Sequence, residues 1–166
     1  MTDGEISRNG LLRLHAEILA DLRAVEGVAA KALEVRGKGG EQADEKSSMA
    51  LAGFLHHFYT GLESIFERIA LAFEGSLPQG PRWHRDLLRS MTVEIPRVRP
   101  VVLREESLIL LEEFLGFRQI FRHAYALPLD RSRLDALAGN LPRALAFSRE
   151  DLLRFLGSVA SSAEAP

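Results

Sequence analysis

Residues 48–73 read SMALAGFLHHFYTGLESIFERIALAF, and their apolar side chains recur every three or four positions. The resulting stripe consists of Leu55, Tyr59, Leu62, Phe66, Ile69 and Phe73. This is the spacing of residues on one face of an α-helix. The segment is therefore predicted to be a long amphipathic helix whose stripe packs against other helices.

The same helical spacing continues through most of the chain, whereas strand signals are poor. Residues 98–103 alone have β-branched density, and two prolines interrupt that region. We predict further helices over about 7–36, 81–91 and 100–126, and a last one that begins near 132. The expected caps are Ser7 and Ser132, Pro100 fits a first turn, Pro142 suggests a kink or a split of the last helix, and Ser148 suggests a second cap. The pattern predicts an all-α, up-down bundle of four or five helices, built from two long antiparallel hairpins and a short helix.

The 166 residues suggest a single domain with extensions at its ends. We divide the chain into an N-terminal helix with a polar, glycine-rich hinge (1–47), a helical domain (48–157) and a frayed tail (158–166). The hinge reads GKGGEQADEKSS over residues 37–48. It carries the turn and loop composition that separates two helices.

Composition excludes several classes of site. The chain has no cysteine, which removes disulfides, thiol nucleophiles and cysteine-ligated metals. No two histidines have the i, i+4 spacing of a zinc-binding helix, so we expect no metal and no cofactor. There is no long apolar run and no secretory signal pattern, so we expect a cytoplasmic protein with no membrane partner. Residues 81–155 hold 13 Arg, no Lys and 10 Asp or Glu, which is weak support for an anionic ligand.

The end of the predicted 100–126 helix breaks the apolar pattern. At about 100° per residue, Arg118 falls at the centre of the stripe formed by Leu111, Phe114 and Leu115. A guanidinium directed into a core is costly unless a partner meets it. The stripe therefore indicates either a functional site or a buried ion pair, for which Glu63 is the expected partner.

His123 lies about 140° from Arg118 on a straight helix. One helix alone is then not expected to bring both side chains to one phosphate. A two-fold homodimer provides the two groups to a shared cleft, so we predict a homodimer.

Residues 118–125 have the pattern Arg118-x4-His123-x-Tyr125, which resembles the signature of HEPN-fold toxins of the HepT type. The likeness extends to LHHFYTGLESIFERIA at 55–70 and to PxGxxWHxxLLxxM at 78–91. An Arg-Pro pair at 99–100 precedes the predicted helix that carries the 118–125 pattern. Together with the helix that follows, these blocks cover about residues 49–155.

The resemblance implies a HEPN-like homodimer that cleaves RNA without a metal, with Arg118 and His123 in a cleft at the dimer interface. It also implies a partner, a nucleotidyltransferase antitoxin of the minimal type, which adenylylates Tyr125. Arg122 and Gln119 are expected to bind phosphate or RNA. Members of this fold often have Asn, His or Asp after the motif arginine, and Gln119 retains both donor and acceptor capacity.

The chemistry fits these residue types. Histidine titrates near working pH and suits acid or base catalysis, and arginine offers a planar fork to phosphate oxygens. His56 and Glu63 share one edge of the 48–73 stripe, where they either support Arg118 or His123 or form an ordinary interhelical hydrogen bond. Trp83 is expected to be a core or interface plug.

Two other functions remain open at this point. The chain is alternatively a catalytically inactive HEPN-fold module that only binds a nucleotidyltransferase. It is otherwise an unrelated helical interaction protein.

Overall fold

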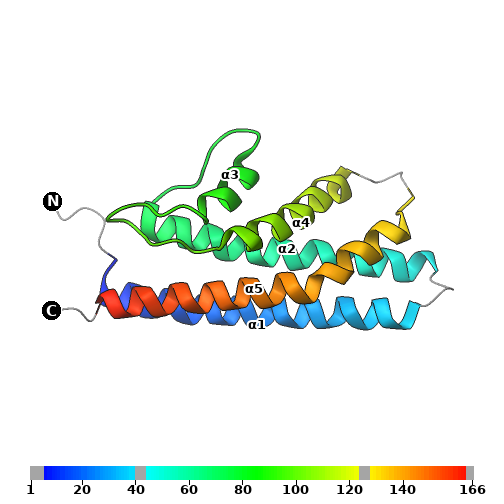
Figure 1. The fold of residues 1–166 in the computed structure, drawn as a ribbon, viewed down its shortest axis with the longest axis horizontal. Helices are drawn as coiled ribbons and strands as arrows, with labels where there is room; N and C mark the ends of the chain where they lie inside the picture. The colour runs from blue at the N-terminus through cyan, green and yellow to red at the C-terminus, as the bar shows by residue number, and fades with distance from the viewer. Residues whose placement is uncertain (1–5, 40–43, 124–127, 164–166) are drawn as a thin grey trace.

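The computed structural model describes residues 6–39, 44–123 and 128–163. They form five helices: α1 (Arg8–Gly39), α2 (Glu45–Glu74), α3 (Trp83–Ser90), α4 (Glu105–His123) and α5 (Arg131–Ala163). The predicted all-α bundle is confirmed (Figure 1). No helix of the described ranges is both long enough and apolar enough to cross a membrane.

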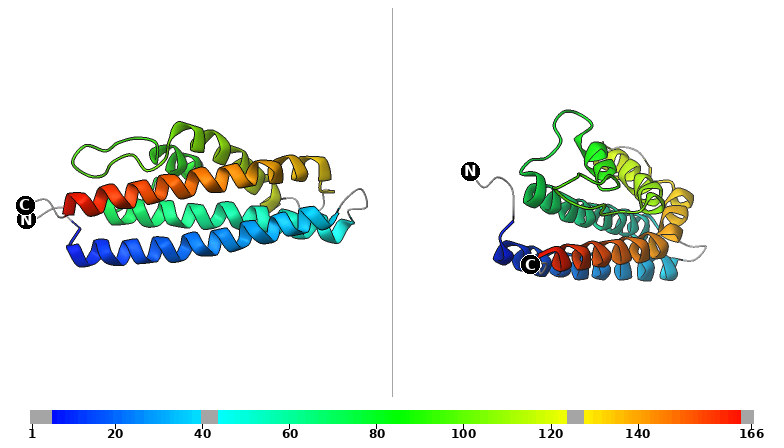
Figure 2. Two further views of the ribbon diagram at one scale, coloured as in Figure 1. Left: turned by 60° about the horizontal axis from the view of Figure 1, so that its bottom comes forward. Right: turned by 60° about the vertical axis from the view of Figure 1, so that its left-hand side comes forward.

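The helices form two antiparallel hairpins, α1 with α2 and α4 with α5 (Figure 1). Helix α2 contacts all four other helices, and α3 and α4 lie on the side of α2 that faces away from α1 (Figures 1 and 2). One hydrophobic core includes residues from every helix. The short α3 therefore packs on both α2 and α4 and fixes the position of its first turn relative to the end of α4.

Local hydrogen bonds explain where the first two helices begin. Ser7 caps α1 as predicted, since its Oγ accepts from the Gly10 amide at 3.1 Å. Helix α1 then continues to Gly39 and α2 starts at Glu45, so the predicted 37–48 hinge is too long. The reason is that Asp44 caps α2 by accepting from the Ser47 amide at 2.8 Å, which extends the helix upstream.

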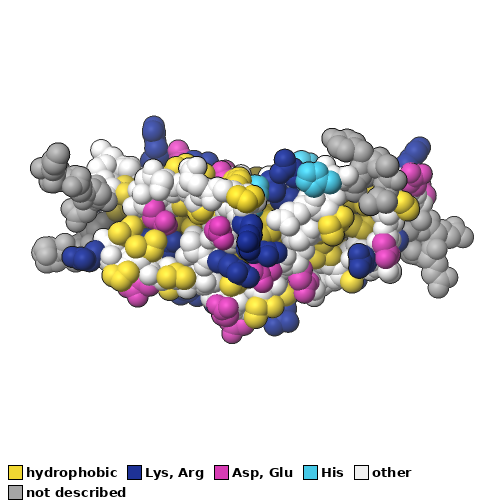
Figure 3. Space-filling view, turned by 90° about the horizontal axis from the view of Figure 1, so that it is seen from above, with side chains coloured by type: hydrophobic (Ala, Val, Ile, Leu, Met, Phe, Trp, Pro, Cys, Tyr) yellow, Lys and Arg dark blue, Asp and Glu magenta, His cyan; other side chains and the backbone are white. Residues whose placement is uncertain are grey.

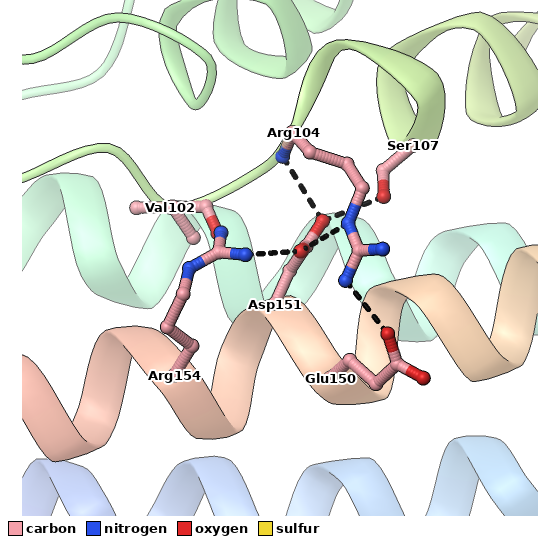
Figure 4. A network of polar contacts seen from close by, with 6 residues as sticks. All are labelled: Val102, Arg104, Ser107, Glu150, Asp151 and Arg154. Atoms are coloured by element: carbon pink, nitrogen blue, oxygen red, sulfur yellow. Dashed lines mark hydrogen bonds and ion pairs between the residues drawn. The ribbon is translucent and has the colours of Figure 1, made fainter.

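The prediction that Pro100 lies in the first turn of this helix is wrong, because residues 100–104 are not helical and α4 begins at Glu105. The cap comes from α5. The fully buried Asp151 carboxylate accepts from the Arg104 amide at 3.0 Å and from Ser107 Oγ at 2.6 Å (Figure 4). It also accepts from the side chains of Arg104 and Arg154. Burial alone would raise the pKa of Asp151, but these hydrogen bonds and charges hold it below its ordinary value.

Helix α5 differs from its predicted form in three places. Asp130, not Ser132, caps it, because the Asp130 side chain accepts from the Ser132 amide at 3.0 Å. The helix runs through Pro142 without a break, and the side chains of Leu141 and Ala144 on either side are buried in the core. Ser148 is a buried residue inside the helix and not a second cap. Packing on both sides of the proline thus outweighs its missing amide.

Candidate functional site

A cleft of about 670 Å³ opens between the start of α3 and the end of α4. Its lining consists of Gly80, Pro81, Arg82, Trp83, His84, Arg85, Arg118, Gln119, Arg122 and His123. These described lining residues include four arginines and two histidines and no carboxylate. Seen from the α3 and α4 side, Arg or Lys and His side chains gather on this face (Figure 3). The composition of the cleft favours an anionic ligand.

Arg118 points toward the interior, as the helical wheel predicts. It is 8% exposed and shares its face of α4 with the buried Leu111, Phe114 and Leu115. Arg118 nevertheless lines the cleft. The fold therefore holds a cation at the boundary between the core and the ligand space.

Glu63 of α2 lies behind this cation and is 2% exposed. Its Oε1 is 3.5 Å from Arg118 Nη2, so the predicted Arg118–Glu63 pair is present. Its Oε2 is 2.9 Å from Nδ1 of His84. Nε2 of His84 in turn lies 3.4 Å from Arg118 Nη1, which closes a triangle of three buried or half-buried groups from α2, α3 and α4.

The contacts of Arg118 are long and incomplete. Hydrogen bonds of this type centre near 2.9–3.0 Å, so 3.4 and 3.5 Å leave the guanidinium weakly held. Its Nε atom is buried and has no hydrogen-bond partner among the described residues. A buried donor without a partner is costly. An anion in the cleft would supply the acceptors that the protein does not.

Trp83 stacks on His84, with ring centroids 3.7 Å apart and planes 30° apart. Trp83 is half-buried against the core, as expected for a plug, but it also lines the cleft.

The hydrogen bond between His84 and Glu63 was not predicted from the sequence. No periodic pattern relates the first turn of an eight-residue helix to the middle of α2, although His84 stands next to the Trp that anchors the segment.

Gln119, Arg122 and His123 are exposed at the end of α4 and line the same cleft as Arg118. Arg118 and His123 thus line one cleft within one chain, together with the 80–85 segment that flanks the end of α4. The prediction that one helix alone does not bring both side chains to one phosphate stays a prediction. The homodimer itself stays a prediction.

Glu63 forms an interhelical hydrogen bond of the kind that the sequence allowed, with His84, but Nδ1 of His56 does not form one. The His56 ring packs against Phe121 with centroids 5.3 Å apart, and its buried Nδ1 has no hydrogen-bond partner in the described part of the chain. Burial lowers the pKa of His56, and the positive charges of Arg118, His57 and Arg122 lower it further.

Two neighbours of Glu63 respond to its buried charge. Burial and then the Glu63 charge raise the pKa of the fully buried Tyr59 phenol. Burial and the same charge also raise the pKa of Glu67, while His84 and Arg118 act in the opposite direction.

Tyr125, the predicted adenylylation site, lies outside the described residues. Its adenylylation therefore stays a prediction. Among the described residues, no group of three or more His, Asp or Glu side chains is placed to hold a metal ion.

Comparison with known proteins gives one match. The sequence model of a family described as HepT-like protein matches residues 50–159, which is more than half of the chain. No curated protein and no solved structure matches. The matched range contains the 80–85 segment and α4, whose residues line the cleft, and most of α2, which carries Glu63.

Proposed function

Since this chain belongs to the HepT-like family, we propose that it is a metal-independent endoribonuclease and the toxin of a toxin–antitoxin pair. Cleavage takes place in the α3–α4 cleft through Arg118 and His123. The observation that carries the proposal is the buried, under-bonded guanidinium of Arg118 at the edge of a cleft with four arginines and no acidic lining residue.

Arg118 binds the phosphate at which the chain is cut. Its guanidinium presents parallel N–H groups that match two phosphate oxygens. The same fork stabilises the extra negative charge that develops at phosphorus in the transition state. Because Arg118 is 8% exposed, this interaction occurs where water screens it little.

His123 transfers a proton in the reaction. It is exposed at the end of α4 and borders the cleft, so it is accessible to RNA. The 2′-hydroxyl attacks phosphorus, and the products are a 2′,3′-cyclic phosphate and a 5′-hydroxyl. Arg122 and Gln119 lie on the same wall and bind flanking phosphates or bases.

A nucleotidyltransferase antitoxin neutralises the enzyme by adding AMP to Tyr125. Tyr125 is two residues from His123 in the sequence. A phosphate added there occupies the space and the positive potential that RNA phosphate needs. Two copies of the chain form a homodimer in the cytoplasm, with the cleft at or beside the interface.

The test is cleavage of a 5′-labelled single-stranded RNA pool in excess chelator by the purified wild-type chain, His123→Ala and His57→Ala. His57 is an exposed histidine that does not line the cleft, so it is the matched control. We expect cleavage by the wild type and His57→Ala, and a loss of at least about 100-fold for His123→Ala. Equal cleavage by His123→Ala would remove His123 from the mechanism, and an inactive wild type would favour a binding module without catalysis.

A further inference from the structure

His84 is a second imidazole in the cleft and belongs to α3, whereas His123 belongs to α4. His84 comes from the first turn of α3, and its side chain is 15% exposed. Its ring is held on one side by the stacked indole of Trp83. His84 therefore reaches the ligand space with a fixed ring plane, whereas His123 is exposed at the end of α4.

The neighbours of His84 fit one tautomer of its ring. An ionised carboxylate only accepts hydrogen bonds, so the 2.9 Å contact with Glu63 Oε2 is a hydrogen bond when Nδ1 of His84 carries the hydrogen. A guanidinium only donates, so the 3.4 Å contact with Arg118 Nη1 is a hydrogen bond when Nε2 has a free lone pair. The two contacts together are satisfied by the neutral ring with its hydrogen on Nδ1.

A neutral histidine whose Nδ1–H is held by a buried carboxylate presents Nε2 as a proton acceptor. This is the arrangement of the histidine base in hydrolases that use a carboxylate, a histidine and a hydroxyl. The Arg118 contact at Nε2 is long and easily exchanged. When a phosphate draws the Arg118 guanidinium toward the cleft, Nε2 becomes free to accept a hydrogen bond from a substrate hydroxyl.

Building on the proposed ribonuclease function, we infer that His84 is the general base of the reaction, with Glu63 as its positioning residue, and that His123 is the general acid. Nε2 of His84 takes the proton from the 2′-hydroxyl as the 2′-oxygen bonds to phosphorus. The bond from phosphorus to the 5′-oxygen breaks, and protonated His123 gives its proton to that oxygen. Both histidines then return to their starting states by proton exchange with water.

This assignment explains why the cleft contains two histidines from different helices. Metal-free RNA cleavage needs one group to remove a proton and another to supply one to the leaving oxygen. It also divides the roles by environment, because the carboxylate-held, half-buried ring serves as the base and the exposed ring serves as the acid.

The experiment measures single-turnover rates on the labelled RNA pool from pH 5 to 9, in chelator, for the wild type, His84→Gln, His84→Ala and the control His57→Gln. His84→Gln retains a side-chain amide that can donate to Glu63, so the triangle and the fold are kept while the base is lost. We expect at least about a 100-fold loss of rate for both His84 variants with little change in RNA affinity. Free imidazole should restore part of the His84→Ala rate.

The outcomes separate the two proposals. A wild type that cleaves, with a His84→Gln variant as active as His57→Gln, overturns the base assignment and leaves the ribonuclease function standing. The same applies if the loss in His84→Gln is one of RNA affinity alone, or if imidazole restores nothing. A wild type that does not cleave overturns the ribonuclease function and with it the base. Thermal unfolding of each variant shows that a lost rate is not a lost fold.

Discussion

The buried contact between Arg118 and Glu63 predicts a large energetic coupling between α4 and α2. The charged atoms are 3.5 Å apart, and the two side chains are 10% and 3% exposed. At an effective dielectric constant of about 20, charges at this distance attract by about 5 kcal/mol before the cost of removing them from water. Glu63→Gln leaves the Arg118 charge buried without a counter-charge. We therefore expect it to lower the free energy of unfolding by about 3–5 kcal/mol.

A double-mutant cycle isolates this contact. Arg118→Met removes the buried cation while keeping an unbranched side chain of similar length. The variant with both substitutions should be much more stable than the sum of the single losses implies, with a coupling energy of about 2–3 kcal/mol. Urea unfolding at one fixed protein concentration, with an unchanged slope, gives the four free energies.

A surface pair provides the matched control. Arg149 and Glu26 are closer, with Nε and Oε1 2.9 Å apart, but their side chains are 54% and 35% exposed. Exposed pairs of this kind contribute about 0–1 kcal/mol. If burial decides the energy, the more distant buried pair couples more strongly than the closer surface pair. A coupling energy for Arg118 and Glu63 no larger than that of the control pair would refute the reasoning that the two residues form a buried ion pair.

Three further outcomes follow from the structure. The pKa of His56 is lowered in the folded state, so the unfolded chain gains a proton first as the pH falls below about 6.5. Urea unfolding should therefore show that the wild type loses more stability than His56→Gln between pH 7 and pH 5. The control His57→Gln should behave like the wild type. Asp151→Ala should cost about 3–5 kcal/mol in the same assay, because it leaves the start of α4 uncapped and buried donors unpaired, whereas the exposed neighbour Glu150→Ala should cost less than about 1 kcal/mol. Light scattering at micromolar concentration should give about twice the 18.4 kDa of one chain, and a monomer would remove the dimer from the proposal.

The sequence predicted those parts of the fold that depend on local periodicity. The spacing of apolar residues was enough to assign the helices and to place Arg118 on the inner face of α4, with Glu63 as its partner. It did not predict that Asp151 of α5 caps α4, because a cap supplied from another helix leaves no signal in the capped segment. The same holds for His84, which meets Glu63 only after α3 packs on α2.

Prolines and glycines were the other source of error, for a related reason. They are strong local signals, but α5 runs through Pro142 and α1 continues to Gly39. In α5, core contacts on both sides of Pro142 outweigh the local cost of the proline, whereas residues 36–39 at the end of α1 are exposed and continue the helix without core contacts. The candidate site was located in part from Arg118, whose cation lies on an apolar stripe. A conflict of this kind between residue type and pattern is typical of functional positions.

The most direct test of the account is a crystal structure of the chain with a non-cleavable 2′-O-methyl RNA dinucleotide. We predict that the bridging phosphate lies in the α3–α4 cleft, with two of its oxygens within hydrogen-bond distance of the Arg118 guanidinium. We expect His84 and His123 to lie on either side of this phosphate. A dinucleotide bound elsewhere, with Arg118 still held only by Glu63 and His84, would contradict this prediction.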